Sequence, residues 1–311
     1  MRQAQLDLAW IVLLKDYDMK KIFYGFVGIL FAACNQKVDV SDDVNNVKVD
    51  FKKIYSYAKK AKDAYASETD IEKTYSDKLV FSANLEKTQG HYFVLKDVST
   101  KEIFISIRGT ANIKNALKDA EYTKNKDNKL AILLHKGFNE STDELYENLQ
   151  SHIIQFKKEF TFNITGHSLG GAMAVILMMH LQVDGYKLGS VITFGQPKVT
   201  NEKGVKQVDD SPLLRIINND DLVPLVPPRS LVSATHGFFR HMGPEIILLG
   251  GEAYIHLSHG PAEKEDVTAF WNKLGHQSLK DHFMDNYLAQ IKSKLERSKE
   301  VPYSDKKNFE K

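Results

Sequence analysis

Residues 161–172 read Thr161-Phe162-Asn163-Ile164-Thr165-Gly166-His167-Ser168-Leu169-Gly170-Gly171-Ala172, which is the pattern of a strand, a tight turn and a helix. Apolar and polar side chains alternate before the first glycine, as in a strand with one buried face, and the apolar run to Met179 predicts a buried helix. Gly166 and Gly170 remove the side chains that would collide where strand and helix close together around Ser168. We therefore expect an exposed Ser168 hydroxyl at a helix N-terminus, where backbone N–H groups favour developing negative charge.

The Gly-x-Ser-x-Gly pattern is weak evidence when it stands alone, since roughly one chain of this length in ten would contain it by chance. The alternative is an ordinary glycine-rich turn between a strand and a helix. The flanking periodicity and the candidate partners further along the chain favour a nucleophile elbow made of Gly166, His167, Ser168 and Gly170.

The composition is that of an ordinary soluble globular protein, with 311 residues, 42% hydrophobic and 26% charged. The 42 basic and 40 acidic residues nearly balance, so no strong field supports nucleic-acid binding. The only cysteine is Cys34, which excludes an intrachain disulfide.

The N-terminal segment looks like an export signal. Met19-Lys20-Lys21 precedes an apolar run, residues 22–33, that is too short to span a bilayer comfortably. The run ends at Phe31-Ala32-Ala33-Cys34, and small residues before a cysteine resemble a bacterial lipoprotein signal. This resemblance implies cleavage before Cys34, a diacylglycerol on its sulfur and a membrane-anchored protein of the bacterial cell envelope. A plain secretory signal, giving a secreted protein, and an uncleaved anchor are the alternatives.

The chain divides into five expected segments. Two lysines follow Met19, as in the basic start of a signal peptide, so we expect translation to begin there. Residues 1–18 would then not belong to the protein, and residues 19–34 would be the signal. Residues 35–46 are polar and suit a tether, and residues 47–292 are expected to form one domain. Residues 293–311 are dominated by Lys, Glu, Ser and Asp, which predicts a solvated, frayed tail.

Hydrophobic periodicity outlines the domain. The expected elements are helices over 51–66 and 142–159, the second introduced by Ser141 and Glu144 at capping-box spacing, and strands at 91–96, 102–108, 161–165, 190–194, 213–218 and 245–249. Strands separated by helical or loop segments indicate the α/β class, with a mostly parallel sheet flanked by helices.

A serine nucleophile needs a base and an acid, and after this kind of turn they follow in the order Ser, Asp, His. Asp220 and Asp221 come directly after the strand at 213–218, where α/β sheets place functional groups. Either aspartate fits on geometry alone. The histidines that follow them are His241, His256, His259, His276 and His282.

Five blocks resemble the class 3 (fungal-type) lipase family and occur in that family's order between about residues 50 and 290. They are Ile107-Arg108-Gly109-Thr110, His135-Lys136-Gly137-Phe138, Gly166 to Gly171, Phe194-Gly195-Gln196-Pro197-Lys198-Val199 and Asp221-Leu222-Val223-Pro224. The resemblance implies an α/β-hydrolase fold. It also implies a serine carboxylester hydrolase that cleaves acylglycerol or phospholipid esters, with no metal or organic cofactor.

The resemblance assigns roles to individual residues. The triad becomes Ser168, Asp221 and His282, with Asp220 as the alternative acid, because His282 matches the family's base near the end of the domain. His241 instead resembles a block that leads into a late strand. The backbone N–H groups of Leu169 and Thr110 become the donors of the oxyanion hole, and the Thr110 hydroxyl is a further candidate.

Residues 112–118 resemble the short lid helix of these lipases. Ile113 and Leu117 are its apolar residues, but Lys114 and Lys118 flank them, so an opening lid would expose little apolar area. The alternative is a surface helix with no gating role.

Two other classes of function stay open. An acyltransferase would use the same triad and pass the acyl group to an alcohol, whereas a non-catalytic envelope lipoprotein would keep the fold for binding. A metal site at His256 and His259 lacks a supporting carboxylate or cysteine cluster. The choice among lipase, phospholipase A1 and esterase, and the oligomeric state, stay open as well.

Overall fold

The computed structural model describes residues 48–86, 88–110, 113, 123–208, 211–227, 237–258 and 279–309. The predictions for Cys34, residues 1–46, Leu117, His259 and His276 fall outside these residues, as does most of the candidate lid. The described residues belong to one compact unit. None of their helices has the length and apolar character needed to cross a membrane.

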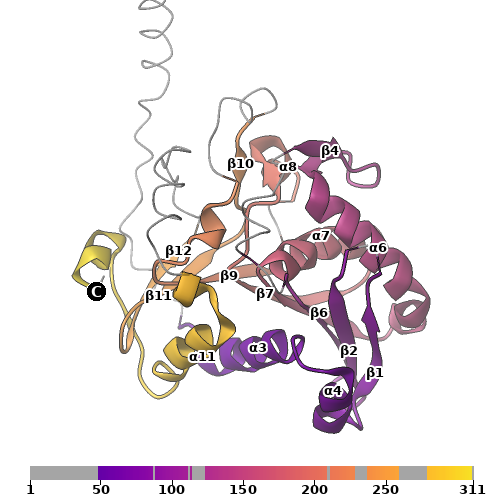
Figure 1. The fold of residues 1–311 in the computed structure, drawn as a ribbon, viewed down its shortest axis with the longest axis horizontal. Helices are drawn as coiled ribbons and strands as arrows, with labels where there is room; N and C mark the ends of the chain where they lie inside the picture. The colour runs from indigo at the N-terminus through magenta and orange to yellow at the C-terminus, as the bar shows by residue number, and fades with distance from the viewer. Residues whose placement is uncertain are drawn as a thin grey trace, which may run out of the picture. The chain divides into compact units, whose positions relative to one another are not determined.

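A nine-stranded sheet runs through the unit, in the order β1-β2-β3-β6-β7-β9-β11-β12-β13 (Figure 1). Its strands are β1 (Leu79–Asn84), β2 (His91–Asp97), β3 (Glu102–Ile107), β6 (Thr161–His167), β7 (Leu188–Phe194), β9 (Leu213–Asn218), β11 (Glu245–Leu248), β12 (Ala253–Leu257) and β13 (Lys299–Glu300). The run from β3 to β11 is parallel. The pairs β1–β2, β2–β3 and β11–β12 are antiparallel, and β13 is parallel to β12. The predicted α/β class, with a mostly parallel sheet, is confirmed.

Helices cover both faces of this sheet (Figure 1). One face carries α6 (Lys136–Ile153) and α7 (Leu169–Val183), and the other carries α3 (Phe51–Asp63) and α11 (Met284–Lys292). The other helices among the described residues are α4 (Glu68–Tyr75), α8 (Glu202–Lys206) and short 3-10 turns at Ile154–Phe156, Val223–Leu225, Leu279–His282 and Tyr303–Phe309. A small second sheet has the order β10 (Phe239–Arg240), β8 (Thr200–Asn201), β5 (Leu133–His135) and β4 (Lys124–Lys126).

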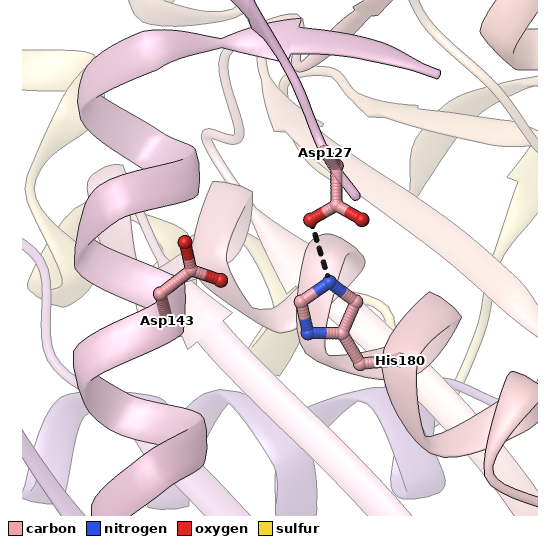
Figure 2. Close-up of side chains that lie close together, drawn as sticks. All are labelled: Asp127, Asp143 and His180. Carbon is pink, nitrogen blue, oxygen red and sulfur yellow. Dashed lines mark hydrogen bonds and ion pairs between the residues drawn. The ribbon is translucent and has the colours of Figure 1, made fainter. Parts of the chain in front are cut away.

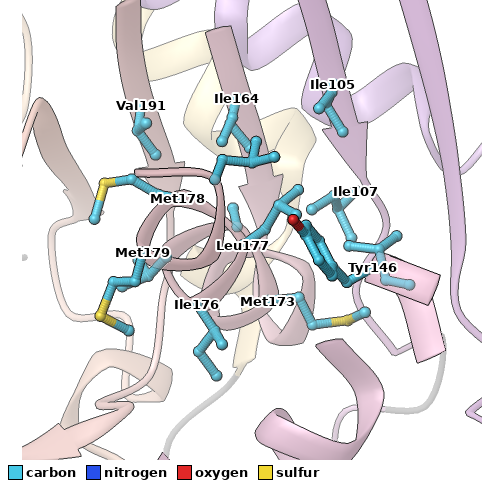
Figure 3. Close-up of a cluster of buried hydrophobic side chains, with 14 of the residues drawn as sticks. Ile105, Ile107, Tyr146, Ile164, Met173, Ile176, Leu177, Met178, Met179 and Val191 are labelled. Carbon is cyan, nitrogen blue, oxygen red and sulfur yellow. The ribbon is translucent and has the colours of Figure 1, made fainter. Parts of the chain in front are cut away.

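The core centres on α7, which is buried on all sides. Figure 3 shows its Met173, Ile176, Leu177, Met178 and Met179 between strand residues such as Ile164 and Val191 and the Tyr146 side chain of α6. An element that buries every face has an apolar sequence without a polar stripe, which is why the run after Ser168 predicted a buried helix. The burial fixes the start of α7, and with it the position of Ser168.

The predicted start of α6 is wrong. The helix begins at Lys136, and the Ser141 hydroxyl donates to the carbonyl of Gly137 one turn earlier, at 2.8 Å. Glu144 accepts hydrogen bonds from the backbone and hydroxyl of Thr88 at 3.0 and 2.8 Å. The two residues with capping-box spacing therefore have other partners inside a helix that is already formed.

The predicted solvated tail is also wrong over its described residues. The Lys294 ammonium is buried and donates to the carbonyls of Leu249 and Gly251 at 2.7 and 2.8 Å. Beyond it, β13 pairs with β12, and Val301 packs in an apolar cluster with Ile255. A few apolar residues among charged ones are enough to pack this segment against β12. The overall composition of the segment does not reveal them.

The chain enters the domain at the amino ends of the parallel strands. Lys48 and Asp50, just before α3, line a surface hollow of about 230 Å³ together with Ser190, Leu214 and Ile246. These three residues lie in the first half of β7, β9 and β11.

Candidate active site

Ser168 lies between β6 and α7 with a strained backbone, at φ 59° and ψ −127°. Such a conformation costs on the order of 1–3 kcal/mol and persists only where the surroundings impose it. A Cβ atom at Gly166 would collide with the carbonyl of Gly170, and one at Gly170 would collide with the carbonyl of Ile107. The predicted elbow geometry is therefore present, and its two glycines are required by close approach of the backbone.

The expected exposure of Ser168 is wrong, since the residue is 1% exposed. Gly109 lies so close to the Ser168 Cβ atom that a Cβ of its own would approach it to 2.9 Å. The turn that follows β3 thus covers the elbow, which sequence periodicity does not reveal.

Asp221 and His282 form a buried pair. Asp221 follows β9, His282 ends a 3-10 turn, and His282 Nδ1 lies 3.0 and 2.9 Å from the two carboxylate oxygens of Asp221. Asp221 also accepts hydrogen bonds from the Tyr287 hydroxyl at 2.6 Å and from the Val223 backbone at 2.9 Å. Asp220 is instead paired with Lys306 at 3.5 Å, so the structure brings Asp221, and not Asp220, to the imidazole.

These contacts fix charge and tautomer. Burial acts to raise the pKa of the Asp221 carboxyl, but the charge of His282 and the hydrogen bonds from His282, Tyr287 and Val223 outweigh it, so that pKa lies below its usual value. An ionised carboxylate only accepts hydrogen bonds, so His282 Nδ1–H donates, and in the neutral imidazole the lone pair is on Nε2. Among the described residues, neither His282 Nε2 nor Ser168 Oγ has a hydrogen-bond partner, and both atoms are buried.

His167 links the elbow to the loop that carries His282. Its Nε2–H donates to the His282 carbonyl at 2.7 Å, and its Nδ1 accepts from the Tyr65 hydroxyl at 2.8 Å. The Tyr65 oxygen accepts in turn from the Gly109 backbone N–H at 3.1 Å. Burial, followed by the charge of His282, lowers the pKa of His167 to about 3, which keeps this imidazole neutral.

A pocket of about 450 Å³ opens onto this arrangement. It is lined by Lys62, Asp63, Tyr65, Ala66, Thr110, Ile113, His167, His282, Phe283, Met284 and Asp285. Lys62 and Asp285 form an ion pair. Thr110, just after β3, is one of the lining residues, and Leu169 is the first residue of α7.

Ile113, from the candidate lid, packs against an apolar cluster around the acid. The cluster consists of Leu222, Val223, Val226 and Leu279, with Leu225 partly buried beside them. The lid assignment thus has one described contact, next to Asp221.

Two further histidines lie away from the pair. His241 donates from Nε2 to the Pro224 carbonyl at 2.7 Å, and burial with the charges of Arg215 and Lys198 holds its pKa well below the usual value. His256 lies on β12 beside the hollow at the amino ends of the strands.

Sequence reasoning did not assign roles to Tyr65 and Tyr287, whose hydroxyls bind His167 and Asp221. Tyr287 lies five residues after His282 on the next helix, which is a weak local signal. The contact of Tyr65 joins residues 102 positions apart and leaves no pattern along the chain.

Comparison with known proteins gives a consistent result. The model of the family "Lipase (class 3)" matches residues 104–231, a range that holds Thr110, Ser168 and Asp221 but not His282. The chain is 33% identical to secreted mono- and diacylglycerol lipase 1 of Fusarium solani over 188 residues, which are 58% of this chain and 54% of that protein. It is 26% identical to phospholipase A1 PLIP1 of Arabidopsis thaliana over 156 residues, 45% of this chain and 24% of that protein.

Among solved structures, Lip2 lipase of Yarrowia lipolytica superposes with a TM-score of 0.61 at 20% identity, covering 76% of this chain and 93% of that one. This likeness establishes the α/β-hydrolase fold. The chain spans about half the length of the fungal lipases to which it is similar in sequence. Over residues 104–231 the chain therefore matches the class 3 lipase family in its motifs and its family model, and it shares the fold of the solved lipases.

Proposed function

We propose that the protein is a serine carboxylester hydrolase that cleaves acylglycerol or phospholipid ester bonds through an acyl-enzyme on Ser168. The observation that carries the proposal is the pairing of His282 Nδ1 with Asp221, which leaves a lone pair on His282 Nε2 in the same buried site as the unpartnered Ser168 Oγ. His167, next to Ser168 in the chain, donates to the His282 carbonyl, which ties the strained serine to the loop that carries the base, as nucleophilic acyl transfer requires.

The reaction proceeds in two halves. His282 Nε2 takes the proton of Ser168 Oγ as this oxygen attacks the ester carbonyl, and Asp221 stabilises the imidazolium that forms. The backbone N–H groups of Leu169 and Thr110 stabilise the oxyanion. The imidazolium then gives its proton to the leaving alcohol, and a water molecule, activated by the same imidazole, releases the acyl group from Ser168.

The substrate class rests on the pocket and on the relatives. Ala66, Ile113, Phe283 and Met284 give the pocket apolar walls, which suit an acyl chain. One relative is a mono- and diacylglycerol lipase and another is a phospholipase A1, so the shared substrate class is a glycerolipid ester.

The test is hydrolysis of p-nitrophenyl esters, emulsified di- and triacylglycerol and phosphatidylcholine by residues 35–311, with Ser168→Ala in parallel. Activity that the substitution abolishes supports the hydrolase and ranks its substrates. Added alcohol acceptors distinguish a transferase, because only the partition of the acyl group differs. A folded wild type that cleaves none of these esters contradicts the proposal and favours a binding role.

We also propose that the protein is anchored to a bacterial membrane through lipid on Cys34. The support is the sequence Phe31-Ala32-Ala33-Cys34 after an apolar run with a basic start. Labelling with a radioactive fatty acid tests it: label should enter the wild type and not Cys34→Ser. Equal label in both proteins would contradict a lipid anchor on Cys34.

A further inference from the structure

Asp127, Asp143 and His180 meet at the end of α7 remote from Ser168. Asp127 follows β4, Asp143 lies on α6, and His180 lies in the last turns of α7. One potential ligand atom from each residue lies within 4.8 Å of the others (Figure 2). Leu169 and His180 are eleven positions apart, which corresponds to about 16 Å along the helix, so this cluster is separate from the elbow.

Asp127 fixes the tautomer of His180. One carboxylate oxygen of Asp127 accepts from the Leu130 backbone N–H at 2.6 Å, and the other lies 2.9 Å from His180 Nε2. Because a carboxylate only accepts, the proton of the imidazole resides on Nε2. In the neutral imidazole the lone pair is then on Nδ1.

This lone pair has no partner among the described residues. His180 is 3% exposed, and its Nδ1 atom is buried without a hydrogen bond. Figure 2 shows the ring edge that carries Nδ1 facing the carboxylate of Asp143. A proton or a metal ion between this nitrogen and the carboxylate would bind to both.

The surroundings favour a cation at this point. Glu140 and Glu147 lie one turn before and after Asp143 on α6, and their charges act on Asp143. The nearby Lys129 is paired with Asp184 at 2.7 Å and stacks over the Tyr146 ring. The Lys129 ammonium therefore neutralises Asp184 and not Asp143.

We propose that His180 Nδ1 and the Asp143 carboxylate bind a divalent transition-metal ion, with Asp127 holding His180 in the ligating orientation from behind. A carboxylate that accepts the other N–H of a metal-bound histidine is the usual support for such a ligand. Imidazole suits Zn²⁺, Ni²⁺ or Cu²⁺, whereas Ca²⁺ and Mg²⁺ prefer oxygen ligands alone. We choose Zn²⁺ as the probe.

The geometry allows this with little movement. Ligand atoms around a tetrahedral Zn²⁺ lie roughly 3.4 Å apart, given bonds of about 2.1 Å. Asp143 is exposed on its helix, so a rotamer change can bring its carboxylate closer. Water completes the coordination. The ion would join the turn after β4 to α6 and α7, and no step of ester hydrolysis passes through it.

The test is isothermal titration of the full chain, stripped with chelator and freed of any affinity tag, with ZnCl₂, CaCl₂ or MgCl₂ alone. We expect saturable Zn²⁺ binding near one equivalent that Asp143→Asn weakens by at least about tenfold, the range that loss of metal-site partners produces. Glu147→Gln, one turn away on the same helix, is the matched control and should bind as the wild type does. Asp143 is exposed, so its substitution should leave the fold intact.

A second measurement reports the histidine. Co²⁺ in place of Zn²⁺ should give a visible spectrum with nitrogen ligation in the wild type and lose it in Asp143→Asn. Zn²⁺ binding of equal strength in wild type and Asp143→Asn would overturn the proposal, and so would binding of Ca²⁺ in preference to Zn²⁺. Because the readout is binding and not hydrolysis, these results do not depend on the proposed ester hydrolase.

Discussion

His282 Nδ1 lies within 3.0 Å of both carboxylate oxygens of Asp221, whereas Asp220, its neighbour in the chain, points to Lys306. Two adjacent aspartates therefore have different roles: Asp221 orients the imidazole, whereas Asp220 forms an ion pair near the surface. This difference makes Asp220 a matched control for Asp221.

Asp221→Asn should lower kcat by about 10⁴-fold, because the amide cannot stabilise the imidazolium and presents a donor to a nitrogen that needs an acceptor. Asp220→Asn should change kcat less than about threefold, since a partly exposed ion pair contributes little. Initial rates on a soluble p-nitrophenyl ester measure both. A larger loss in Asp220→Asn would reassign the acid.

Ser168→Gly should unfold at higher urea concentration than Ser168→Ala, although both lack the nucleophile. The backbone of Ser168, at φ 59° and ψ −127°, suits glycine and strains alanine. We expect a difference of about 1 kcal/mol in unfolding free energy, which is the relief of strain less the entropy that glycine adds to the unfolded chain. Equal stability would mean that the elbow is not strained.

Tyr65→Phe should impair both stability and turnover. The change leaves the Gly109 N–H and His167 Nδ1 without a partner, which should cost about 1–3 kcal/mol of unfolding free energy. It also loosens the turn that carries Thr110, so kcat should fall about tenfold, part of the 10²–10³ that a lost oxyanion donor costs. KM should stay unchanged. Tyr55→Phe in α3 is the control, and a loss confined to KM would argue for substrate binding instead.

Acid should destabilise the protein partly through His167. Its folded pKa of about 3 lies below the ordinary value, so the unfolded state binds more protons between those two values and stability falls as pH falls through that window. Between pH 7 and pH 5 this histidine should contribute about 2 kcal/mol of that loss. Urea unfolding of His167→Asn at both pH values should show a smaller loss than wild type by that amount. An identical pH dependence would contradict the assignment.

Ile113 provides the test of the lid. If the segment closes the site through its contact with the cluster at Leu222 and Leu279, Ile113→Ser should raise activity on a soluble ester relative to activity on an emulsion. We expect a shift of a few-fold in that ratio. Lys114→Ser is the neighbouring control, and a ratio that both substitutions leave unchanged would favour a surface helix without gating.

Short-range sequence patterns predicted the structures that form between residues close together in the chain. The elbow at Ser168, the strand before it and the helix after it follow from glycine spacing and periodicity. Asp221 and His282 came from family resemblance, because an interaction across 61 residues has no local pattern. Tyr65 was missed for the same reason. His180 was hidden because it lies inside an apolar run, where nothing along the chain indicates that Asp127 and Asp143 approach it. The docking of residues 293–309 depends on single residues such as Val301, which composition averages away.

The point where the chain enters the domain has a consequence for how a tethered enzyme would reach its substrate. Entry is at the amino ends of β7, β9 and β11, whereas Ser168 and Asp221 follow the carboxyl ends of β6 and β9. A seven-residue strand such as β6 is about 23 Å long, so the attachment point and the pocket face opposite ends of the sheet. Residues 35–46 can extend to roughly 40 Å, enough to pass along the whole sheet. If Cys34 carries lipid, a tether of this length would let the domain rotate until its pocket faces the membrane that anchors it. A tether shorter than the sheet would keep the pocket facing away from the anchoring membrane. The enzyme would then reach only substrates that do not lie in that membrane.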